Sequence, residues 1–355
     1  MILITGGAGF IGSNFVLHLL NDSTVPTKVV VVDCLTYAGN MNNLKSEINN
    51  PNFFFEKCKI NNTLGIRDIL QKYRPNAVVN FAAESHVDRS ILSPSKFIET
   101  NINGTYNLLQ ASFDYYLTLD NKNFKFLHIS TDEVYGSLDL TAPSFTEDNP
   151  YQPNSPYAAS KASSDFLVRA WNKTYGFPTL ITNCSNNYGP FQFPEKLIPL
   201  VILNAIDLKK IPIYGDGKQI RDWIFVTDHC EAIKEVLTNG IVGETYNIGG
   251  NCEYQNIDLV KKICHILDEL SPIKNTSKKI KKYSDLIHFV QDRPGHDKRY
   301  SVNNEKIKST LNWTPKENLT SGLRKTINWY LKNNEWINSI KNKSYQEWIK
   351  LKYGN

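Results

Sequence analysis

Two adjacent carboxylic acids, Asp132 and Glu133, follow an apolar run at 124–131 that has the pattern of a buried strand. Ligands of open parallel sheets bind beyond the carboxyl ends of the strands. Two acids held there in different protonation states could act on a substrate as general acid and general base. In the alternative interpretation, Asp132 caps the turn after the strand and Glu133 is solvated. Taken alone, this stretch fits the alternative better.

A second pair of reactive side chains, Tyr157 and Lys161, is four residues apart in a predicted helix at 157–175. Residues at this spacing share one face of a helix. A lysine ammonium beside a phenol stabilises the phenolate, so we expect Lys161 to lower the pKa of Tyr157. Tyr157 is then a candidate base for a sugar or alcohol hydroxyl. Tyr-x-x-x-Lys is also a common surface pattern, and it gains weight here from the elements around it.

A glycine-rich loop at 6–12 stands between a short apolar strand at 2–5 and a helical pattern that continues to Leu20. Its glycines fit both G-x-G-x-x-G and G-x-x-G-x-x-G, in which the backbone approaches a pyrophosphate at a helix N-terminus. A second strand, 28–33, ends in Asp33, about 20 residues beyond the loop, where the ribose-binding acid of a dinucleotide fold belongs. No Lys or Arg directly follows Asp33, which favours NAD over NADP. The alternative is a tight turn with an incidental acid.

The elements that position these residues alternate along the chain. Further strands are predicted at 52–56 and 77–81, with a helix at 63–73 between them and a longer helix at 95–117. This alternation indicates an α/β fold with a Rossmann-type, doubly wound parallel sheet. From about residue 190 the pattern changes, which indicates a smaller α/β substrate-binding lobe.

The composition of the 355-residue chain is ordinary, with 41% hydrophobic and 21% charged residues and a net charge of +5. Its lysines are spread along the chain, so nothing indicates a nucleic-acid partner. The six cysteines form no C-x-x-C pair and no histidine cluster has zinc-like spacing, so we expect no metal and a reducing compartment. The first residues lead directly into a strand, and no apolar run is long enough to cross a membrane. We therefore expect a soluble, cytoplasmic protein without a membrane partner.

Several longer stretches narrow the interpretation. They are 5–12, 82–90, 130–136, 157–161, 184–190, 194–199, 213–217 and 292–297. Through them the chain, from residue 1 to about 330, resembles the nucleoside-diphosphate-glucose 4,6-dehydratases of the extended short-chain dehydrogenase/reductase superfamily. The triplet Thr131-Asp132-Glu133 is the most specific part, because related epimerases and reductases lack the acid pair.

The resemblance implies an NAD-dependent dehydration of a nucleoside-diphosphate-glucose to a 4-keto-6-deoxy sugar. Tyr157 would be the base for oxidation at C4, with Lys161 as its electrostatic partner and Thr131 as a hydrogen-bond partner of the same hydroxyl. The C4 ketone acidifies the C5 proton, which Glu133 would remove while protonated Asp132 donates to the C6 hydroxyl that leaves as water. The hydride would then return from the cofactor to C6. Two acids in different protonation states meet this requirement.

The resemblance also implies binding residues. For the cofactor NAD they are Gly6, Gly9, Phe10, Ile11, Gly12, Asp33, Thr36, Ile60, Ala82, Ala83, Thr100, Tyr157 and Lys161. For the nucleotide sugar they are Ser85, Asn186, Lys196, Tyr214, Arg221, Asn256, Arg293 and His296. Lys59 departs from the family, which usually has an acid there to accept a hydrogen bond from adenine, and a lysine cannot accept one.

Some of these residues could have a structural role instead of the implied contact. Guanidinium groups match phosphate oxygens, so Arg221 and Arg293 suit a diphosphate, but either could form a surface or inter-lobe ion pair instead. Tyr214 could pack on a base or in the core. His296 could bind a sugar or phosphate, or cap a turn.

With the resemblance, we predict three parts for the chain. They are an NAD-binding domain at 1–189 and about 218–251, a nucleotide-sugar-binding lobe at 190–217 and 252–330, and a helical tail at 331–355. Strands near 221–226 and 244–248 are expected to return to the sheet of the first domain. The tail, with Trp336 and Trp348, is expected to be an amphipathic helix packed on the surface.

Competing functions remain open. Thymine and uracil differ by one methyl group, worth about 1–3 kcal/mol in a pocket, so both dTDP-glucose and UDP-glucose are candidate substrates, the first favoured by its frequency in the family. A nucleotide-sugar 4-epimerase would need Tyr157 and Lys161 but not the acid pair, and a non-catalytic NAD-binding protein would need none of them. The helices at 95–117 and 157–175 carry more apolar surface than one sheet can cover, which predicts a homodimer.

Overall fold

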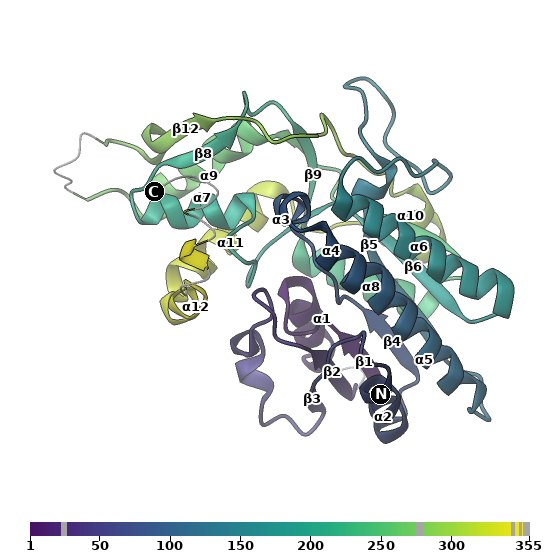
Figure 1. Cartoon of the computed structure of the whole chain (residues 1–355). Coiled ribbons are helices and arrows are strands. Elements are labelled where there is room, and N and C mark those ends of the chain that lie inside the picture. Colours follow the sequence, from purple (N-terminus) through teal and green to yellow (C-terminus); the bar gives the residue numbers. More distant parts are fainter. Residues whose placement is uncertain (23–26, 275–279, 342–344, 348–349, 351–355) are drawn as a thin grey trace.

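A central sheet of seven parallel strands organises the computed structural model, which describes residues 1–22, 27–274, 280–341, 345–347 and 350 (Figure 1). The strand order is β10-β6-β5-β4-β1-β2-β3. These strands are β1 Ile2–Thr5, β2 Val29–Asp33, β3 Phe53–Lys57, β4 Ala77–Asn80, β5 Lys125–Thr131, β6 Thr179–Cys184 and β10 Thr245–Ile248. The predicted Rossmann-type sheet is confirmed. The connections change direction between β1 and β4, the point at which ligands bind in such sheets.

Helices cover both faces of this sheet because successive strand residues point to opposite sides. On one face, Ile4 and Val31 pack in a cluster with α1 Phe10–Leu20 and α8 Val226–Asn239. On the other, Leu3 and Val30 pack in a cluster with α2 Thr63–Tyr73, α5 Thr105–Leu117 and α6 Pro156–Tyr175. The sheet is therefore doubly wound, as predicted. Figure 1 shows α5 and α6 side by side.

The predicted helix at 95–117 is continuous but not uniform. It consists of α4 Pro94–Phe97, the π-helical segment η2 Ile98–Gly104 and α5. Buried Asn101 of η2 accepts a hydrogen bond from Glu84 N (2.8 Å) and donates to Glu84 O (3.0 Å) and to Ser160 Oγ of α6 (2.8 Å). The wider turn thus ties the loop after β4 to α6, in keeping with the frequent occurrence of π segments at functional sites.

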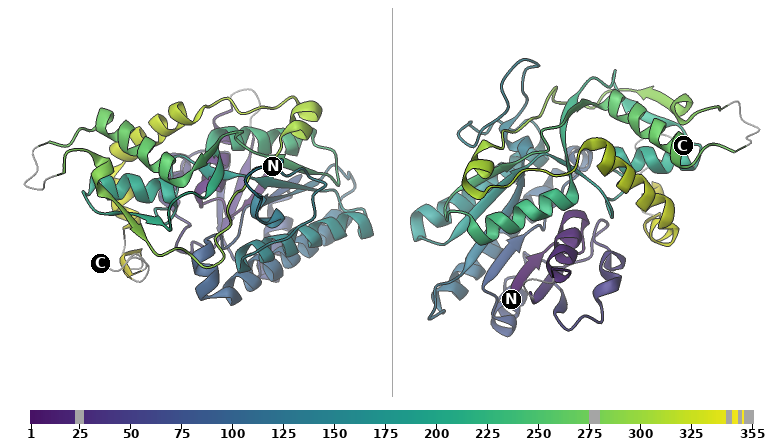
Figure 2. Two further views of the ribbon diagram at one scale, coloured as in Figure 1. Left: turned by 90° about the horizontal axis from the view of Figure 1, so that it is seen from above. Right: turned by 180° about the vertical axis from the view of Figure 1, so that it is seen from behind.

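A second group of elements packs around its own apolar cluster, beside the central sheet in both views of Figure 2. Its members are α7 Leu197–Ile206, β8 Ile211–Tyr214, α9 Asn256–Leu270, β12 Ile287–Val290 and α11 Leu319–Lys332. Strands β8 and β12 pair in parallel. We call this group the second lobe, and it corresponds to the smaller α/β lobe expected from the sequence.

One strand prediction is wrong. The segment near 221–226 does not join the central sheet but forms β9 Ile220–Phe225, in a separate sheet between β7 Asn186–Tyr188 and β11 Glu253–Gln255. The buried carboxylate of Asp222 accepts hydrogen bonds from Gly250 N (2.9 Å) and Cys252 N (2.6 Å), which fasten β9 to the segment before β11. The strand near 244–248 does join the central sheet, as β10 beside β6.

The last described helix, α12 Asn334–Ile340, packs Trp336, Ile337 and Ile340 into the cluster of the second lobe. Trp348 of the predicted tail lies outside the described residues. The exact boundaries of the three predicted parts remain a prediction. The shorter elements are η1 Met41–Glu47, α3 Val87–Leu92, η3 Asp132–Tyr135, η4 Tyr283–Leu286 and α10 Glu305–Leu311. Among the described residues, no helix has the length and apolar character needed to span a membrane.

Candidate active site

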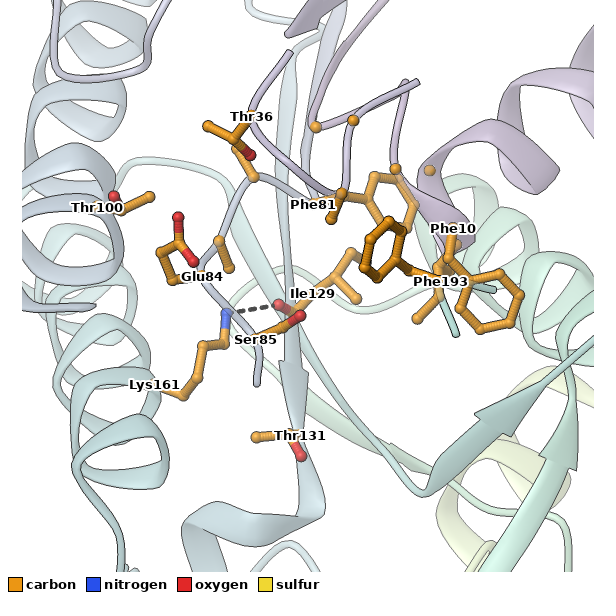
Figure 3. A pocket seen from close by; sticks show the side chains of 18 of the residues that line it. Phe10, Thr36, Phe81, Glu84, Ser85, Thr100, Ile129, Thr131, Lys161 and Phe193 are labelled. Carbon is orange, nitrogen blue, oxygen red and sulfur yellow. Dashed lines mark hydrogen bonds between the residues drawn. The ribbon is translucent and has the colours of Figure 1, made fainter. Parts of the chain in front are cut away.

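A cavity of about 650 Å³ opens at the carboxyl edge of the central sheet (Figure 3). Its walls come from the ends of β1, β2, β4, β5 and β6 and from the N-terminal part of α6. All five predicted catalytic residues line it, namely Thr131, Asp132, Glu133, Tyr157 and Lys161. The structure therefore brings the acid pair and the Tyr–Lys pair together around one space.

Local capping presents these residues to the cavity. Thr131 ends β5, and its Oγ1 accepts a hydrogen bond from Glu133 N (3.3 Å), which starts the short helix η3 and its acid pair. Ser155 caps α6 by accepting from Ala158 N (3.1 Å), and a proline follows at the first helical position. Both chemical pairs thus sit at a change of secondary structure, where the backbone direction is set by a cap.

The two acids occupy different electrostatic environments. Burial raises the pKa of Asp132 well above its ordinary value, and the neighbouring Glu133 and Asp222 raise it further. Asp132 Oδ2 is buried and has no hydrogen-bond partner among the described residues. Burial also raises the pKa of Glu133, but the positive charges of Arg293, Lys196 and Arg221 act in the opposite direction. Burial thus raises the pKa of both acids, but the neighbouring charges differ: those around Asp132 favour its proton, and the three cations favour the charge on Glu133.

The pKa of Tyr157 is raised, not lowered as predicted. Burial raises it well above its ordinary value, the charge of Glu133 raises it further, and a hydrogen bond with Thr131 acts in the opposite direction. The ammonium of Lys161 instead donates to Ile129 O (2.8 Å; Figure 3) and lies 3.2 Å from His128 Nε2. Burial lowers the pKa of Lys161 to about 8. The predicted lowering of the pKa of Tyr157 by Lys161 is therefore not seen.

A buried polar network behind Lys161 was not predicted from the sequence. His128 Nε2 lies 3.4 Å from Asp165 Oδ1, and Asp165 Oδ2 accepts a hydrogen bond from Ser130 Oγ (2.8 Å). On the other side, His128 Nδ1 is 3.1 Å from Asn80 Nδ2. The signal that could have revealed it is a histidine inside an otherwise apolar strand. This network fixes the position of the ammonium at the cavity wall.

The glycine-rich loop forms a backbone cradle. Gly6 has a φ of +67°, and a Cβ added there would lie 2.6 Å from Ala82 N, so only glycine fits. Asp33 accepts hydrogen bonds from Ala8 N (3.0 Å) and Leu35 N (2.8 Å), and burial raises its pKa. The loop and the predicted ribose acid are therefore held as one unit.

Every predicted cofactor residue lines this cavity. They are Gly6, Gly9, Phe10, Ile11, Gly12, Asp33, Thr36, Ile60, Ala82, Ala83, Thr100, Tyr157 and Lys161. Lys59, the residue that departs from the family, lines it as well. This arrangement suits a dinucleotide. The backbone of the loop allows a close approach on one side of the cavity, and an acid stands at the end of β2 on the other.

The predicted substrate residues divide into two sets. Ser85, Asn186 and Lys196 line the cavity, and Lys196 Nζ donates to Ser85 O (2.7 Å). The other five, Tyr214, Arg221, Asn256, Arg293 and His296, are not among its lining residues. Three of the eight are thus placed at the cavity.

The two arginines nevertheless act on the acid pair, since both lower the pKa of Glu133. Arg221 is buried over the ring of Tyr300, 4.3 Å from its centroid, and donates to Asp297 O (3.0 Å). Arg293 Nη1 is 3.9 Å from Asp88 Oδ1. The contact of Arg293 is an ion pair of the kind foreseen as the alternative, whereas Arg221 makes a ring contact and a backbone hydrogen bond instead.

Of the remaining three residues, two are in contact with each other and the third is separate. Tyr214 donates to Asp88 Oδ2 (3.0 Å) and meets the ring of His296 edge-on at 6.2 Å. His296 Nδ1 is 2.6 Å from Asp292 Oδ1. Asn256 Oδ1 is buried without a hydrogen-bond partner among the described residues.

A contact between the two sides of the cavity was also missed. Glu195 accepts from Tyr37 Oη (2.9 Å) and pairs with Arg89 Nε (2.8 Å), whose guanidinium lies 3.9 Å from the centre of the Tyr37 ring. Tyr37 follows β2, whereas Glu195 precedes α7. No sequence pattern links residues so far apart.

Comparison with known proteins agrees with this geometry. Residues 3–326 match the family model described as GDP-mannose 4,6 dehydratase. The dTDP-glucose 4,6-dehydratase of Neisseria meningitidis is 56% identical over 348 residues, 97% of each chain. The dTDP-glucose 4,6-dehydratase 1 of Escherichia coli is 53% identical over 363 residues, 99% of this chain and 98% of the relative.

Solved structures are similar over the same extent. The dTDP-glucose 4,6-dehydratase of Streptomyces venezuelae, crystallised with NAD, has a TM-score of 0.86 and 44% identity, covering 96% of this chain and 99% of that one. A UDP-glucose 4-epimerase from Thermotoga maritima has a TM-score of 0.80 and 28% identity, covering 94% and 99%. The higher identity and the acid pair both favour the first group. The chain belongs to the dTDP-glucose 4,6-dehydratases, NAD-binding members of the extended short-chain dehydrogenase/reductase superfamily.

Proposed function

We propose that this chain is an NAD-dependent dTDP-glucose 4,6-dehydratase, a hydro-lyase. The observation that carries the proposal is the contrast within the acid pair. Asp132 is buried and biased toward its protonated form, whereas Glu133 is surrounded by three cationic side chains, and both face the cavity that holds Tyr157. Redox chemistry alone would not need this contrast, but an elimination does.

The residues present fit NAD. The Gly6–Gly12 cradle would hold the pyrophosphate, Asp33 the ribose, and the residues around Thr100 and Tyr157 the nicotinamide end. When bound, NAD⁺ supplies a hydride acceptor for C4, a positive charge near the phenol and, once reduced, a hydride donor for C6. Lys59 leaves the adenine without a carboxylate acceptor at that position.

In the first half of the reaction, Tyr157 takes the proton from the C4 hydroxyl while Thr131 hydrogen-bonds the same oxygen. Burial raises the pKa of the phenol, so Tyr157 would keep the proton taken from the C4 hydroxyl until that proton is lost to solvent at the end of the turnover. Lys161 is positioned by Ile129 O and His128 rather than by the phenol itself. In our proposal, Lys161 supplies a positive charge, its own ammonium group, at the wall of the cavity.

In the second half, Glu133 removes the proton from C5, which the C4 ketone has made acidic. Asp132 donates its proton to the C6 hydroxyl, the C6–O bond breaks, and water leaves. Arg293, Lys196 and Arg221 act against the effect of burial on Glu133 and so favour its ionised form as the base, whereas the acidic neighbours of Asp132 favour the proton that it donates.

Completion of the reaction needs a hydride at C6, which bound NADH would supply, and a proton at C5, which Glu133 would return. Asp132 would then regain a proton, and Tyr157 would lose the one taken from the C4 hydroxyl, by exchange with solvent before the next turnover.

For the substrate, we propose that Lys196, Ser85 and Asn186 contact the nucleotide sugar from the cavity wall. Arg221 of β9 and Arg293, which follows β12, both act on Glu133, and their guanidinium groups suit the diphosphate. Tyr214, Asn256 and His296 remain candidates for the base and its ribose. UDP-glucose is the competing substrate.

The test uses purified protein with dTDP-glucose and, separately, UDP-glucose. We expect a 4-keto-6-deoxy product, measured by its absorbance in base, with the higher kcat/KM for dTDP-glucose. A product with an unchanged C6 hydroxyl would instead indicate an epimerase, and no turnover with NAD bound would indicate a non-catalytic protein. Equal or better turnover of UDP-glucose would overturn the choice of nucleotide.

We also propose a homodimer formed through α5 and α6. Large apolar side chains are exposed on these helices and on η2, namely Ile98, Tyr106, Leu117, Phe166 and Tyr175. Light scattering should give twice the chain mass, and a monomeric mass in dilute solution would contradict the proposal. A cytoplasmic location stays a prediction, to be checked by cell fractionation.

A further inference from the structure

The C-terminal helix α12 packs in the second lobe and also contacts the nucleotide-binding half, by which we mean the central sheet with the segments that connect its strands, η1 among them. Trp336 Nε1 donates a hydrogen bond to Asn43 Oδ1 (2.6 Å) in η1. Asn43 Nδ2 in turn donates to Ala8 O (2.9 Å). Trp336 is 7% exposed and Asn43 is 3% exposed, so water does not compete for these groups.

Ala8 lies in the glycine-rich loop and is fixed through both of its backbone polar groups. Its carbonyl oxygen also accepts from Asn40 N (2.9 Å), and its N–H donates to the carboxylate of Asp33 (3.0 Å). Displacing the Ala8 carbonyl would therefore also move the partner of Asp33. A continuous chain of hydrogen bonds runs from α12 to the acid at the end of β2.

We propose that Trp336 is a positioning residue for cofactor binding, which acts through Asn43 and Ala8 on the glycine-rich loop and Asp33. The inference rests on the proposed function, because it assumes that this loop binds NAD. It adds a residue more than 300 positions from the loop in sequence, on a tail with no recognised site. We call the link Trp336–Asn43–Ala8 the tail bridge.

The tail bridge matters because the amide of Asn43 is buried. Without the indole N–H, Asn43 Oδ1 is a buried acceptor that must find another donor, and the amide can do so only by rotating away from Ala8. Neutral hydrogen bonds of this kind change an equilibrium by roughly two- to tenfold. The loss would appear in cofactor affinity, since the loop carries the cofactor contacts and the acid pair lies elsewhere.

A second hydrogen bond also joins α12 to the segment that holds Ala8. Asn40 Nδ2, from the residue whose N–H also holds Ala8 O, donates to Ser339 Oγ of α12 (3.3 Å). Two neighbouring positions of η1 and its cap are therefore joined to α12. The helix is placed to hold the loop from outside, without touching the cavity.

The experiment replaces Trp336 by Phe, which keeps an aromatic ring and removes the N–H. With nucleotide removed from the full-length protein, we expect the Kd for NAD by titration calorimetry to rise about fivefold. At saturating NAD, kcat for dTDP-glucose should stay within about twofold of the wild-type value, because no catalytic group has moved. Trp313→Phe is the matched control, since Trp313 Nε1 is buried but makes no hydrogen bond with the described residues. It should lower Tm comparably without changing the Kd.

A double-mutant cycle with Asn43→Ala distinguishes a specific effect of the tail bridge from a general loss of stability. If the tail bridge is real, the effects of Trp336→Phe and Asn43→Ala on the Kd are not additive. If the wild-type protein binds NAD and the Trp336→Phe variant binds it equally well, the inference is overturned. If Trp336→Phe does not fold, an unchanged Kd in Asn43→Ala overturns it as well. Wild-type protein that fails to bind NAD would instead refute the proposed function.

Discussion

The nucleotide-binding half and the second lobe face the same acid pair but hold their functional groups in different ways. In the first, the functional groups are backbone atoms of the loop that begins at Gly6 and side chains at or directly after strand ends, such as Asp33. In the second lobe and the neighbouring strand β9, isolated side chains such as Arg293 and Arg221 are placed by contacts with residues distant in sequence. We therefore expect cofactor binding to depend on the sheet edge and substrate binding to depend on how the lobe packs against it.

The most severe test of this division is Tyr157→Phe. Loss of the base should reduce dehydratase activity by about 10³-fold or more, because C4 oxidation starts every later step. The Kd for NAD should change little if the cofactor site belongs to the backbone cradle. Steady-state turnover and NAD titration measure the two effects, and substantial turnover by the variant would contradict the role of Tyr157.

The acid pair provides the next largest effect. Asp132→Asn and Glu133→Gln should each slow water loss by about 10²–10³-fold, while NAD binding stays intact. Hydride transfer from C4, followed as NADH absorbance in a single turnover, should survive better than water release. Full dehydratase activity in both variants would refute the central claim.

Asp132→Asn should also change how stability depends on pH. The folded-state pKa of Asp132 is raised, so its contribution to stability is present below about pH 4, the range of an ordinary aspartate, and is lost as the pH rises through the folded-state value. Asn has no such titration. The Tm of the variant relative to wild type should therefore increase from pH 4 to pH 8, measured by calorimetry, and a constant difference would contradict the raised pKa.

Arg293→Ala tests the second lobe. We expect KM for dTDP-glucose to rise about tenfold as a phosphate partner is lost, with the Kd for NAD unchanged. Arg293 also lowers the pKa of Glu133, so its removal should shift the acid limb of the kcat profile to higher pH. Arg293→Lys is the control that keeps the charge without the guanidinium fork. An equal loss of NAD affinity would erase the distinction between the two regions.

The smallest expected effect concerns Lys59. Lys59→Asp supplies the acceptor that adenine lacks at this position, so the Kd for NAD should fall about two- to fivefold, with no change in kcat. Calorimetry with NAD measures this, and Lys59→Met controls for loss of the positive charge. A weaker affinity in the Asp variant would show that Lys59 has a favourable role of its own.

The parts that could be predicted from the sequence are those with local signals. The glycine spacing, Asp33 at a strand end and Tyr157 with Lys161 on one helical face identified the cofactor edge, and each of these residues lines the cavity. The acid pair was recognisable because the two residues are adjacent and follow a buried strand. Strand β9 was misplaced because its hydrophobic pattern does not say which sheet it joins.

What the sequence could not reveal depends on residues brought together from afar. His128 and Ile129 hold the ammonium group of Lys161 from the central sheet, and Asp165 lies beside His128. Glu195 and Tyr37 meet across the cavity although they lie on different elements. Five of the predicted substrate residues belong to this class, since their positions follow from packing of the second lobe.

Strand β6 ends at Cys184 and β7 begins at Asn186, so at this crossing a single residue, Ser185, separates the central sheet from the three-stranded sheet that carries β9, and a second short crossing runs from β10 to β11 through residues 249–252. Cys184, Ser185 and Asn186 also line the cavity. Any rotation between the two sheets would therefore have to be accommodated partly at the wall of the cavity. A substitution at Ser185 that stiffened or loosened this crossing would also change the lining of the cavity.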